Sequence, residues 1–412
     1  MSSSPSSSGN HDDNRQKPSS SCHAFPIRPW NSRLLNKQQQ QQPSTPARRT
    51  TQSSTSSLAS TTEDASRTTS VNGSSISNNT NNSNTGGIPR NSASFKNLKT
   101  SEVLSLDSIR ASLIRQEETI IFALIERAQF RHNAIVYEKG GLGHLGTPPG
   151  STAADPDEKL SFLEYMLVGT EALHFAVRRY TSPEEHAFFP ERLPTSDKVL
   201  EDLEFPRLLS DVGHASDVNF NEVLLKKYVQ EVVPSICQAG DDEQHGSTAL
   251  CDVAVLQALS KRVHYGKFVA ESKYLADPEG YQKLVDAGDA EGVMKLLTNE
   301  IVEAKVLRRA RLKAATYGTE PLLAELPPLR PEGGEKTSIV AAAAASAVVA
   351  AIEAMGDDDT TEKKVCPATV ESIYRDLIIP LTKDVEVAYL FRRCGREPPP
   401  EYAPNRMSTD PW

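Results

Sequence analysis

The sequence of 412 residues has little of the chemistry that holds small secreted or metal-dependent proteins together. It contains five Cys residues, and no two of them are spaced as Cys-x-x-Cys. This usage excludes a disulfide framework and a plain zinc site, and it suits a reducing compartment. The chain also lacks any run of about 20 apolar residues, so we expect no membrane-spanning segment and no membrane partner.

Positive charge is scarce as well. The chain has 45 Lys and Arg against 54 Asp and Glu, a formal net charge of -9, and its pI is about 5.6. A general nucleic-acid binder needs a basic face that displaces counterions from phosphates, so we expect no nucleic-acid partner. Hydrophobic residues make up 38% of the chain. Because globular domains contain roughly 45–50%, part of the chain is expected to lie outside a packed core.

Residues 1–100 account for the low apolar content. Ser, Thr, Asn and Gln occupy 54 of these 100 positions, and the segment carries a net +7, which leaves -16 on residues 101–412. Such a composition predicts a disordered arm, because burial cannot offset the chain entropy. Ser and Thr with few acids are also typical of a plastid transit peptide, whereas Asp12, Asp13 and the Gln/Asn bias favour a plain arm. We therefore expect a cytoplasmic protein, with the plastid as the alternative.

From about residue 101 onward, apolar residues recur at helical spacing, and strand-like alternation is scarce apart from residues 135–137. The pattern indicates an all-α fold, a bundle of long helices that forms a single domain over residues 101–397. The expected helices lie at about 107–133, 158–181, 217–236, 248–276, 280–286, 289–317 and 368–394.

Two stretches of this part depart from the helical pattern. Within residues 320–364, Pro327, Pro328 and Pro331 break any helix before an Ala-rich run begins. We interpret 320–364 as a surface insertion into the domain. Residues 398–412 are rich in Pro and form a predicted tail.

Motifs for nucleotide, metal and nucleophile chemistry are missing or incomplete. Residues 141–146 match the dinucleotide string G-x-G-x-x-G, but Thr147, Pro148 and Pro149 follow. That string binds a pyrophosphate only when a helix starts after it, so we predict a flexible loop here. The chain has no P-loop, no H-E-x-x-H and no G-x-S-x-G, and its nine His residues lack ligand spacing. We therefore expect neither a cofactor nor a metal.

The remaining candidates are polar side chains on otherwise apolar helix faces. Arg262 and Lys273 are 11 residues apart, which is about three turns, so both point the same way about 16 Å apart along one helix. Taken singly, such residues usually belong to a solvated face or a surface ion pair. The full candidate set is Arg110, Arg262, Lys273, the i,i+4 pair Asn299 and Glu303, and the i,i+4 pair Thr382 and Glu386.

Three blocks of the sequence, in the same order, resemble the eukaryotic chorismate mutases. They are DSIR with TIIFALIER within residues 107–127, VHYGKFVAE at 263–271, and PLTKDVEVAYL at 380–390. The resemblance extends over about residues 101–318 and 368–394. It implies an all-helical, allosteric homodimer that converts chorismate to prephenate, a Claisen rearrangement on the route to Phe and Tyr. That reaction needs no nucleophile, metal or cofactor, which agrees with the missing motifs.

The resemblance also assigns roles to the candidate set. Arg110 and Arg262 match the family's carboxylate clamps, and a guanidinium binds a carboxylate through two hydrogen bonds. Lys273 matches the donor to the ether oxygen and a carboxylate, and Glu386 faces the same oxygen, where it donates only if protonated. The others match positions beside the substrate hydroxyl and a carboxylate: Asn299, Glu303 and Thr382. Because all seven positions carry the family residue, we favour a catalyst over the alternative, a non-catalytic helical binding or regulatory protein.

A second implied site binds an effector, Trp, Tyr or Phe, where two subunits meet. Its matching elements are the pairs Arg178-Arg179 and Gly246-Ser247. The paired Arg residues would bind the effector carboxylate, and the turn would meet its ammonium group. Alternatively, Arg178-Arg179 is a solvated basic helix end. Nearby the sequence departs from the family pattern at Leu250, Gln244 and His245, which leaves effector selectivity open.

Overall fold

A computed structural model describes residues 103–143, 145–152, 159–195, 200, 207–318 and 364–404. The predicted arm, nearly all of the 320–364 insertion and residues 405–412 of the tail lie outside these residues. Within the described part, every regular element is helical, which confirms the all-α prediction. None of these described helices is long and apolar enough to cross a lipid bilayer.

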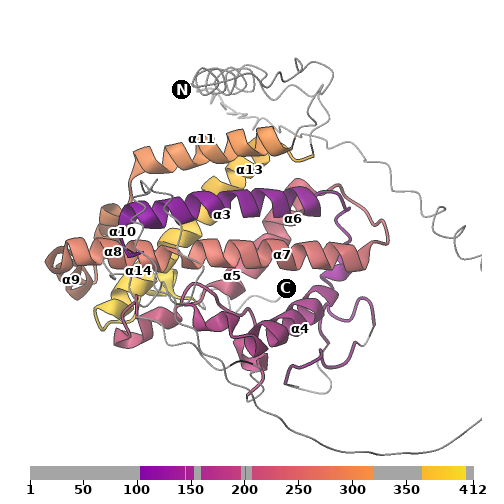
Figure 1. Cartoon of the computed structure of the whole chain (residues 1–412), viewed down its shortest axis with the longest axis horizontal. Helices are drawn as coiled ribbons and strands as arrows, with labels where there is room; N and C mark the ends of the chain where they lie inside the picture. The colour runs from indigo at the N-terminus through magenta and orange to yellow at the C-terminus, as the bar shows by residue number, and fades with distance from the viewer. Residues whose placement is uncertain are drawn as a thin grey trace, which may run out of the picture. The chain divides into compact units, whose positions relative to one another are not determined.

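The connections between successive α-helices are short from α7 to α11, whereas longer stretches of chain precede α4, α5 and α13 (Figure 1). The first half of the domain holds α3 (Leu106–Arg127), α4 (Phe162–Ala176), α5 (Asn221–Lys227) and α6 (Val233–Ile236). The second half holds α7 (His245–His264), α8 (Gly266–Ala276), α9 (Pro278–Ala287), α10 (Ala290–Leu297), α11 (Glu300–Tyr317), α13 (Pro367–Ile373) and α14 (Ile379–Arg393). Short 3₁₀ segments are η2 (Ala134–Val136), η3 (Arg179–Thr181), η4 (Pro190–Arg192), η5 (Val212–Asp217) and η9 (Pro400–Tyr402).

Helix α7 organises the core, because it contacts α3, α4 and α14. Figure 1 shows α3 between α11 and α7, and α3 contacts both. Leu124 of α3 packs in one apolar cluster with Val255, Leu256 and Leu259 of α7, and all four are fully buried. Their burial supplies the apolar area that stabilises the bundle.

Helix α3 ends at Arg127 rather than near residue 133, so the prediction for this end is wrong. The Arg127 side chain is fully buried, and its Nε donates to Asp252 at 2.6 Å. Its other N–H groups donate to the backbone oxygens of Phe130, Arg131 and His132. These bonds fold the chain back, and Asn133 then adopts the left-handed conformation, with φ 51°. Residues 135–137 consequently lie in and after the 3₁₀ turn η2 instead of a strand.

The predicted helix over 289–317 is two helices, α10 and α11. Thr298 is extended, with ψ 133°, and Asn299 precedes α11 with φ -134°. The Asn299 side chain accepts a hydrogen bond from the backbone N of Val302 at 3.1 Å, so it caps the new helix. Asn299 is therefore an N-cap and not a residue inside a helix. The predicted helix over 248–276 is likewise divided, at Tyr265, into α7 and α8.

Two helices contain a wider π-turn directly before a proline. The π-turns are η6 (Tyr228–Val232) and η8 (Tyr374–Ile378), followed by Pro234 and Pro380. Proline lacks an N–H and crowds the preceding turn, and a π-turn accommodates that loss without ending the helix. The chain therefore stays helical from α13 through η8 into α14, close to the predicted 368–394, and carries Thr382 and Glu386 along α14.

The loop with the dinucleotide-like string contains no helix. Gly143 and Gly146 have positive φ angles of 91° and 70°. Residues 147–152 are turns and bends. No helix N-terminus follows the glycines there to receive a pyrophosphate, as predicted.

Candidate active site

Three of the predicted residues meet where α14 packs against α7 and α8. Arg262 lies in the last turn of α7, and its Nη1 donates to Thr382 Oγ1 at 3.4 Å. Thr382 Oγ1 in turn donates to the backbone oxygen of Ile378 at 2.6 Å. Glu386 follows one turn later on α14. Arg262, Thr382 and Glu386 are only 5%, 7% and 6% exposed, so the sequence-predicted residues form a buried polar group between helices.

The Arg262 guanidinium is a buried cation with an unused donor. Its Nε has no hydrogen-bond partner among the described residues, and the same holds for the hydroxyl of Tyr374 nearby. Burial lowers the pKa of Arg262, while Tyr374, Glu117 and Glu386 oppose that shift. An arginine stays charged because its ordinary pKa is so high. A buried donor without a partner costs about 1–3 kcal/mol, so this position suits an anionic ligand.

Glu386 is held where its carboxyl group resists ionisation. Burial raises the pKa of Glu386 to about 7, and the neighbouring Glu303 adds to the shift. Lys273, Arg262 and Lys383 act in the opposite direction. Burial therefore outweighs three nearby cations, and at neutral pH much of the population carries a proton. A protonated Glu386 can donate a hydrogen bond, whereas the ionised form can only accept.

Lys273 and Glu303 approach this group from two other helices. Lys273 on α8 is partly buried, and its Nζ donates to the backbone oxygen of Leu297 at the end of α10. Glu303 lies in the first turn of α11 and pairs with Lys383 of α14 at 2.8 Å. Lys273 and Arg262 both act on Glu386, as expected if they share one helix face.

Asn299 and Arg110 stand apart from the buried group. Asn299 is exposed at the start of α11, where its side chain is used as a cap. The Arg110 side chain is 49% exposed and pairs with Asp107 of its own helix at 3.3 Å. The neighbouring Ile109 is buried in one cluster with Tyr265, so this end of α3 reaches the α7–α8 junction. The role of Arg110 as a carboxylate clamp stays a prediction.

The candidate set omitted three residues that shape the site. Lys383 follows Thr382 directly, so the sequence shows a cation beside a candidate residue, but its pairing with Glu303 of another helix forms only on folding. Tyr374 was hidden because its hydroxyl lies beside Arg262 only after folding. Glu117 of α3 is 1% exposed and accepts two hydrogen bonds from Arg309 of α11, at 2.7 and 2.5 Å. The last pair is 192 residues apart, so no local pattern indicates it.

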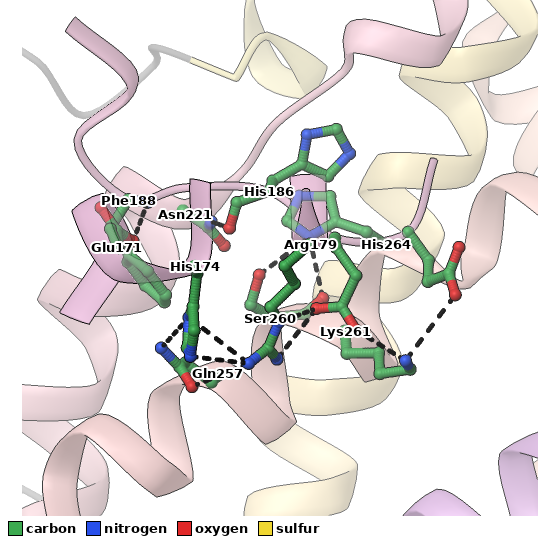
Figure 2. Close-up of polar contacts among 12 residues, drawn as sticks. Glu171, His174, Arg179, His186, Phe188, Asn221, Gln257, Ser260, Lys261 and His264 are labelled. Carbon is green, nitrogen blue, oxygen red and sulfur yellow. Dashed lines mark hydrogen bonds and ion pairs between the residues drawn. The ribbon is translucent and has the colours of Figure 1, made fainter. Parts of the chain in front are cut away.

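The predicted effector arginines follow the end of α4. Arg178 adopts the left-handed conformation, with φ 57°, and turns the chain into η3. Arg179 pairs with Glu185 at 3.0 Å and donates to Gln257 of α7 at 3.2 Å. Figure 2 shows the Arg179 side chain directed toward Gln257. Glu185 also accepts from Lys261 at 2.6 Å, so this end of α4 is tied to α7.

The predicted turn Gly246-Ser247 occupies the first turn of α7, where Gly246 is exposed. Gln257, which binds Arg179, is 11 residues further along, about 16 Å at 1.5 Å per residue. Within one chain the arginines and the turn therefore do not meet. Leu250, at a position where the sequence departs from the family, is 62% exposed on the same part of α7.

The geometry suits a binding site for an anion. Within one helical core it brings together a permanent guanidinium, an ammonium and a carboxyl group whose pKa burial raises to about 7. The described contacts offer orientation and electrostatic stabilisation, and they include no activated nucleophile among the candidate residues. The class is thus an all-helical enzyme that acts by holding and polarising an anionic substrate.

Comparison with known proteins agrees with this class. The family model described as chorismate mutase type II matches residues 245–387. The chloroplastic chorismate mutase 1 of Arabidopsis thaliana is 39% identical over 301 residues, which cover 72% of this chain and 77% of that protein. The chorismate mutase of Emericella nidulans is 38% identical over 301 residues, covering 71% and 94%.

Solved structures give the same result. The Candida albicans chorismate mutase in complex with L-Trp superposes with a TM-score of 0.57 at 36% identity, covering 73% of this chain and 95% of that one. The structure of AtCM1 with tyrosine bound in its allosteric site has a TM-score of 0.54 at 37% identity, covering 72% and 98%.

This chain belongs to the chorismate mutase family, whose members are isomerases that convert chorismate to prephenate. The predicted family, fold class and isomerase activity are confirmed. The curated relatives are enzymes, and this supports the catalytic prediction over a non-catalytic binding protein.

Replacing Arg262 tests whether the buried guanidinium serves the reaction. We expect Arg262→Lys to lower chorismate turnover by roughly 10²–10³-fold, because a lysine cannot donate through two parallel N–H groups. The melting temperature should barely move. Arg311→Lys is a matched control, since Arg311 pairs with Glu371 at 3.0 Å and is 41% exposed. A large loss of melting temperature with normal turnover would make Arg262 structural.

Replacing Glu386 tests the protonated acid. Its pKa is raised to about 7, so wild-type activity should be present below that pH and fall as the pH rises through it. Glu386→Gln keeps an N–H donor at every pH, and its activity should persist to higher pH. The measurement is kcat/KM against pH for both proteins, with Glu371→Gln expected to follow the wild type. Identical profiles for wild type and Glu386→Gln would refute the assignment.

Proposed function

We propose that Arg262, Lys273 and Glu386 carry out the rearrangement of chorismate to prephenate in this chain. In that reaction the ether C–O bond breaks as a new C–C bond forms, and all electrons move within the substrate. The enzyme must hold a flexible dianion in a folded, chair-like conformer and stabilise charge on the ether oxygen. Orientation and preorganised donors supply both effects.

Each group has a task that fits its surroundings. Arg262 binds one substrate carboxylate through the edge that includes its unpaired Nε, while Thr382 holds its Nη1. Lys273 and protonated Glu386 donate to the ether oxygen as it gains negative charge. One observation carries this proposal: the buried Arg262 Nε has no hydrogen-bond partner among the described residues, and Glu386, whose pKa is raised to about 7, acts on the same guanidinium.

The remaining candidates complete the binding site. We assign Arg110 to the second carboxylate, which requires its side chain to leave Asp107 and turn toward α8. Asn299 and Glu303 take the substrate hydroxyl and a carboxylate edge, and Lys383 pairs with Glu303 at 2.8 Å. All of these assignments concern binding and orientation and involve no covalent step.

The direct test is turnover of chorismate by the full chain. We expect chorismate absorbance to disappear and prephenate to form without added metal or nucleotide. The same should hold for the fragment 101–412, which retains every candidate residue. A folded protein that leaves chorismate unchanged would contradict the proposal, and inactive Arg262→Lys beside active wild type would support it.

We also propose a homodimer whose effector site combines Arg178-Arg179 of one subunit with Gly246-Ser247 of its partner. Within one chain Arg179 binds Gln257, which lies about 16 Å along α7 from Gly246, and this supports the arrangement. Exposed apolar residues lie near them and suit an interface: Leu173, Val177 and Leu250. The similar solved structures include complexes with L-Trp, tyrosine and phenylalanine.

Titration of activity with Trp, Tyr and Phe tests the effector site. We expect at least one amino acid to change the rate, and Arg179→Ala to flatten that response because the carboxylate contact is lost. Arg207→Ala is the control, since the Arg207 side chain is 80% exposed and should respond like the wild type. Three flat curves for the wild-type protein would discard the regulatory proposal.

The names of the plant relatives support the plastid, the alternative compartment. The chorismate mutases 1 of Arabidopsis thaliana, Petunia hybrida and Zea mays are all chloroplastic. We keep the cytoplasm as the expected compartment, because acids near the start and the Gln/Asn bias of residues 1–100 favour a plain arm. The plastid stays the alternative.

A further inference from the structure

Gly266 marks the point where α14 lies closest to the start of α8. A Cβ atom placed on Gly266 would be 2.9 Å from Thr382 Cγ2 and 3.0 Å from the Thr382 backbone oxygen. It would also be 3.2 Å from Glu386 Cγ. Real Cβ atoms essentially never approach another heavy atom closer than 3.0 Å, so a side chain at 266 forces Thr382 Cγ2 to shift, and the Thr382 backbone oxygen and Glu386 Cγ must give by a few tenths of an ångström.

The atoms that Gly266 touches belong to the proposed catalytic group. Gly266 comes four residues after Arg262 and seven before Lys273, so at 100° per residue the three lie within about 40° of one another on a continuous helix surface. Tyr265, which separates α7 from α8, keeps near-helical angles of φ -62° and ψ -15°, and Phe268 N donates to Tyr265 O at 3.1 Å across this turn. The face that carries both cations is therefore the face on which Thr382 and Glu386 dock.

Helix propensity argues against glycine at this position. Glycine inside a helix lowers stability relative to alanine, because its unfolded backbone has more freedom to lose. Gly266 lies in the first turn of α8, in helical conformation, so backbone geometry gives no reason for it. The close approach of Thr382 and Glu386 is a reason that the structure does provide.

We propose that Gly266 is a positioning residue that sets the distance from Arg262 and Lys273 to Thr382 and Glu386. The inference rests on the proposed function, because the distance affects catalysis only if these four residues act on one substrate. Gly266 touches no reacting atom itself. It acts by letting α14 approach closely enough for Glu386 to remain buried and for Thr382 to hold Arg262, a bond that is already 3.4 Å long.

The test compares Gly266→Ala with a second helical glycine. Gly169 lies within α4, and a Cβ there would meet Pro148 and Pro149 at ordinary distances of 3.7 and 3.9 Å. We expect Gly169→Ala to keep the wild-type kcat and KM for chorismate. Gly266→Ala should lower kcat at least tenfold. It should also move the pH of half-maximal activity downward, because a displaced Glu386 is better solvated and ionises more easily.

A second substitution separates positioning from packing. Thr382→Ser removes Cγ2, the atom nearest to the added methyl group, and keeps the hydroxyl that accepts from Arg262. In Gly266→Ala/Thr382→Ser we expect part of the lost kcat to return and the pH midpoint to move back toward the wild-type value. Each single variant is measured beside the double variant, so that rescue appears as a departure from the sum of the two single effects on kcat.

The results distinguish failure of the positioning role from failure of the proposed function. A wild-type kcat, KM and pH midpoint in Gly266→Ala, with Arg262→Lys impaired, would overturn the positioning role and leave the proposed function intact. Wild-type activity in both Gly266→Ala and Arg262→Lys would reject the proposed function itself. Three other results would assign Gly266 to helix packing alone and overturn the inference. The first is a drop in melting temperature with unchanged kcat and pH midpoint. The others are absence of rescue by Thr382→Ser and failure of both the single and the double variant to fold.

Discussion

The packing of α14 on α7 and α8 buries a guanidinium, and the rest of the site depends on that burial. Arg262 cannot lose its charge at physiological pH, so the interior must provide compensation for it. Glu386 is the nearby acid, yet burial raises its pKa to about 7 and weakens it as a counter-charge. The described residues thus leave the Arg262 Nε unpaired, and under the proposed function a substrate carboxylate accepts from it. A substrate carboxylate and a protonated acid fit that arrangement together.

Local charge, rather than net charge, has to attract the substrate. Residues 101–412 carry -16, which at long range repels a dianion. At physiological ionic strength such fields fade beyond about 8 Å, so the contacts inside the site decide binding. There the cations are unequally compensated. Lys383 is paired with Glu303, whereas Arg262 retains a free Nε donor.

Buried ion pairs distant in sequence keep the helices in register around this site. Glu117 joins α3 to α11 through Arg309, and Arg127 joins α3 to α7 through Asp252. Breaking one partner of such a pair leaves an uncompensated charge, which makes these contacts sensitive to mutation. A further pair, Lys261 with Glu185, links the two proposed sites. Lys261 directly precedes Arg262, and Glu185 also binds Arg179. The proposed effector arginine, Arg179, and the proposed catalytic arginine, Arg262, therefore lie on elements in direct contact.

The sequence by itself determined the all-helical class, the approximate helices and, through its resemblance to a family, the residues now seen around Arg262 and Glu386. Helical periodicity and capping are local, so they are readable from neighbours three or four positions apart. Tertiary structure alone decided that α3 ends at Arg127 and that Tyr374 and Glu117 surround Arg262. It also decided the raised pKa of Glu386. The Arg127–Asp252 bond and the approach of Tyr374 and Glu117 to Arg262 join residues more than 100 positions apart, and burial and desolvation depend on which distant surfaces meet.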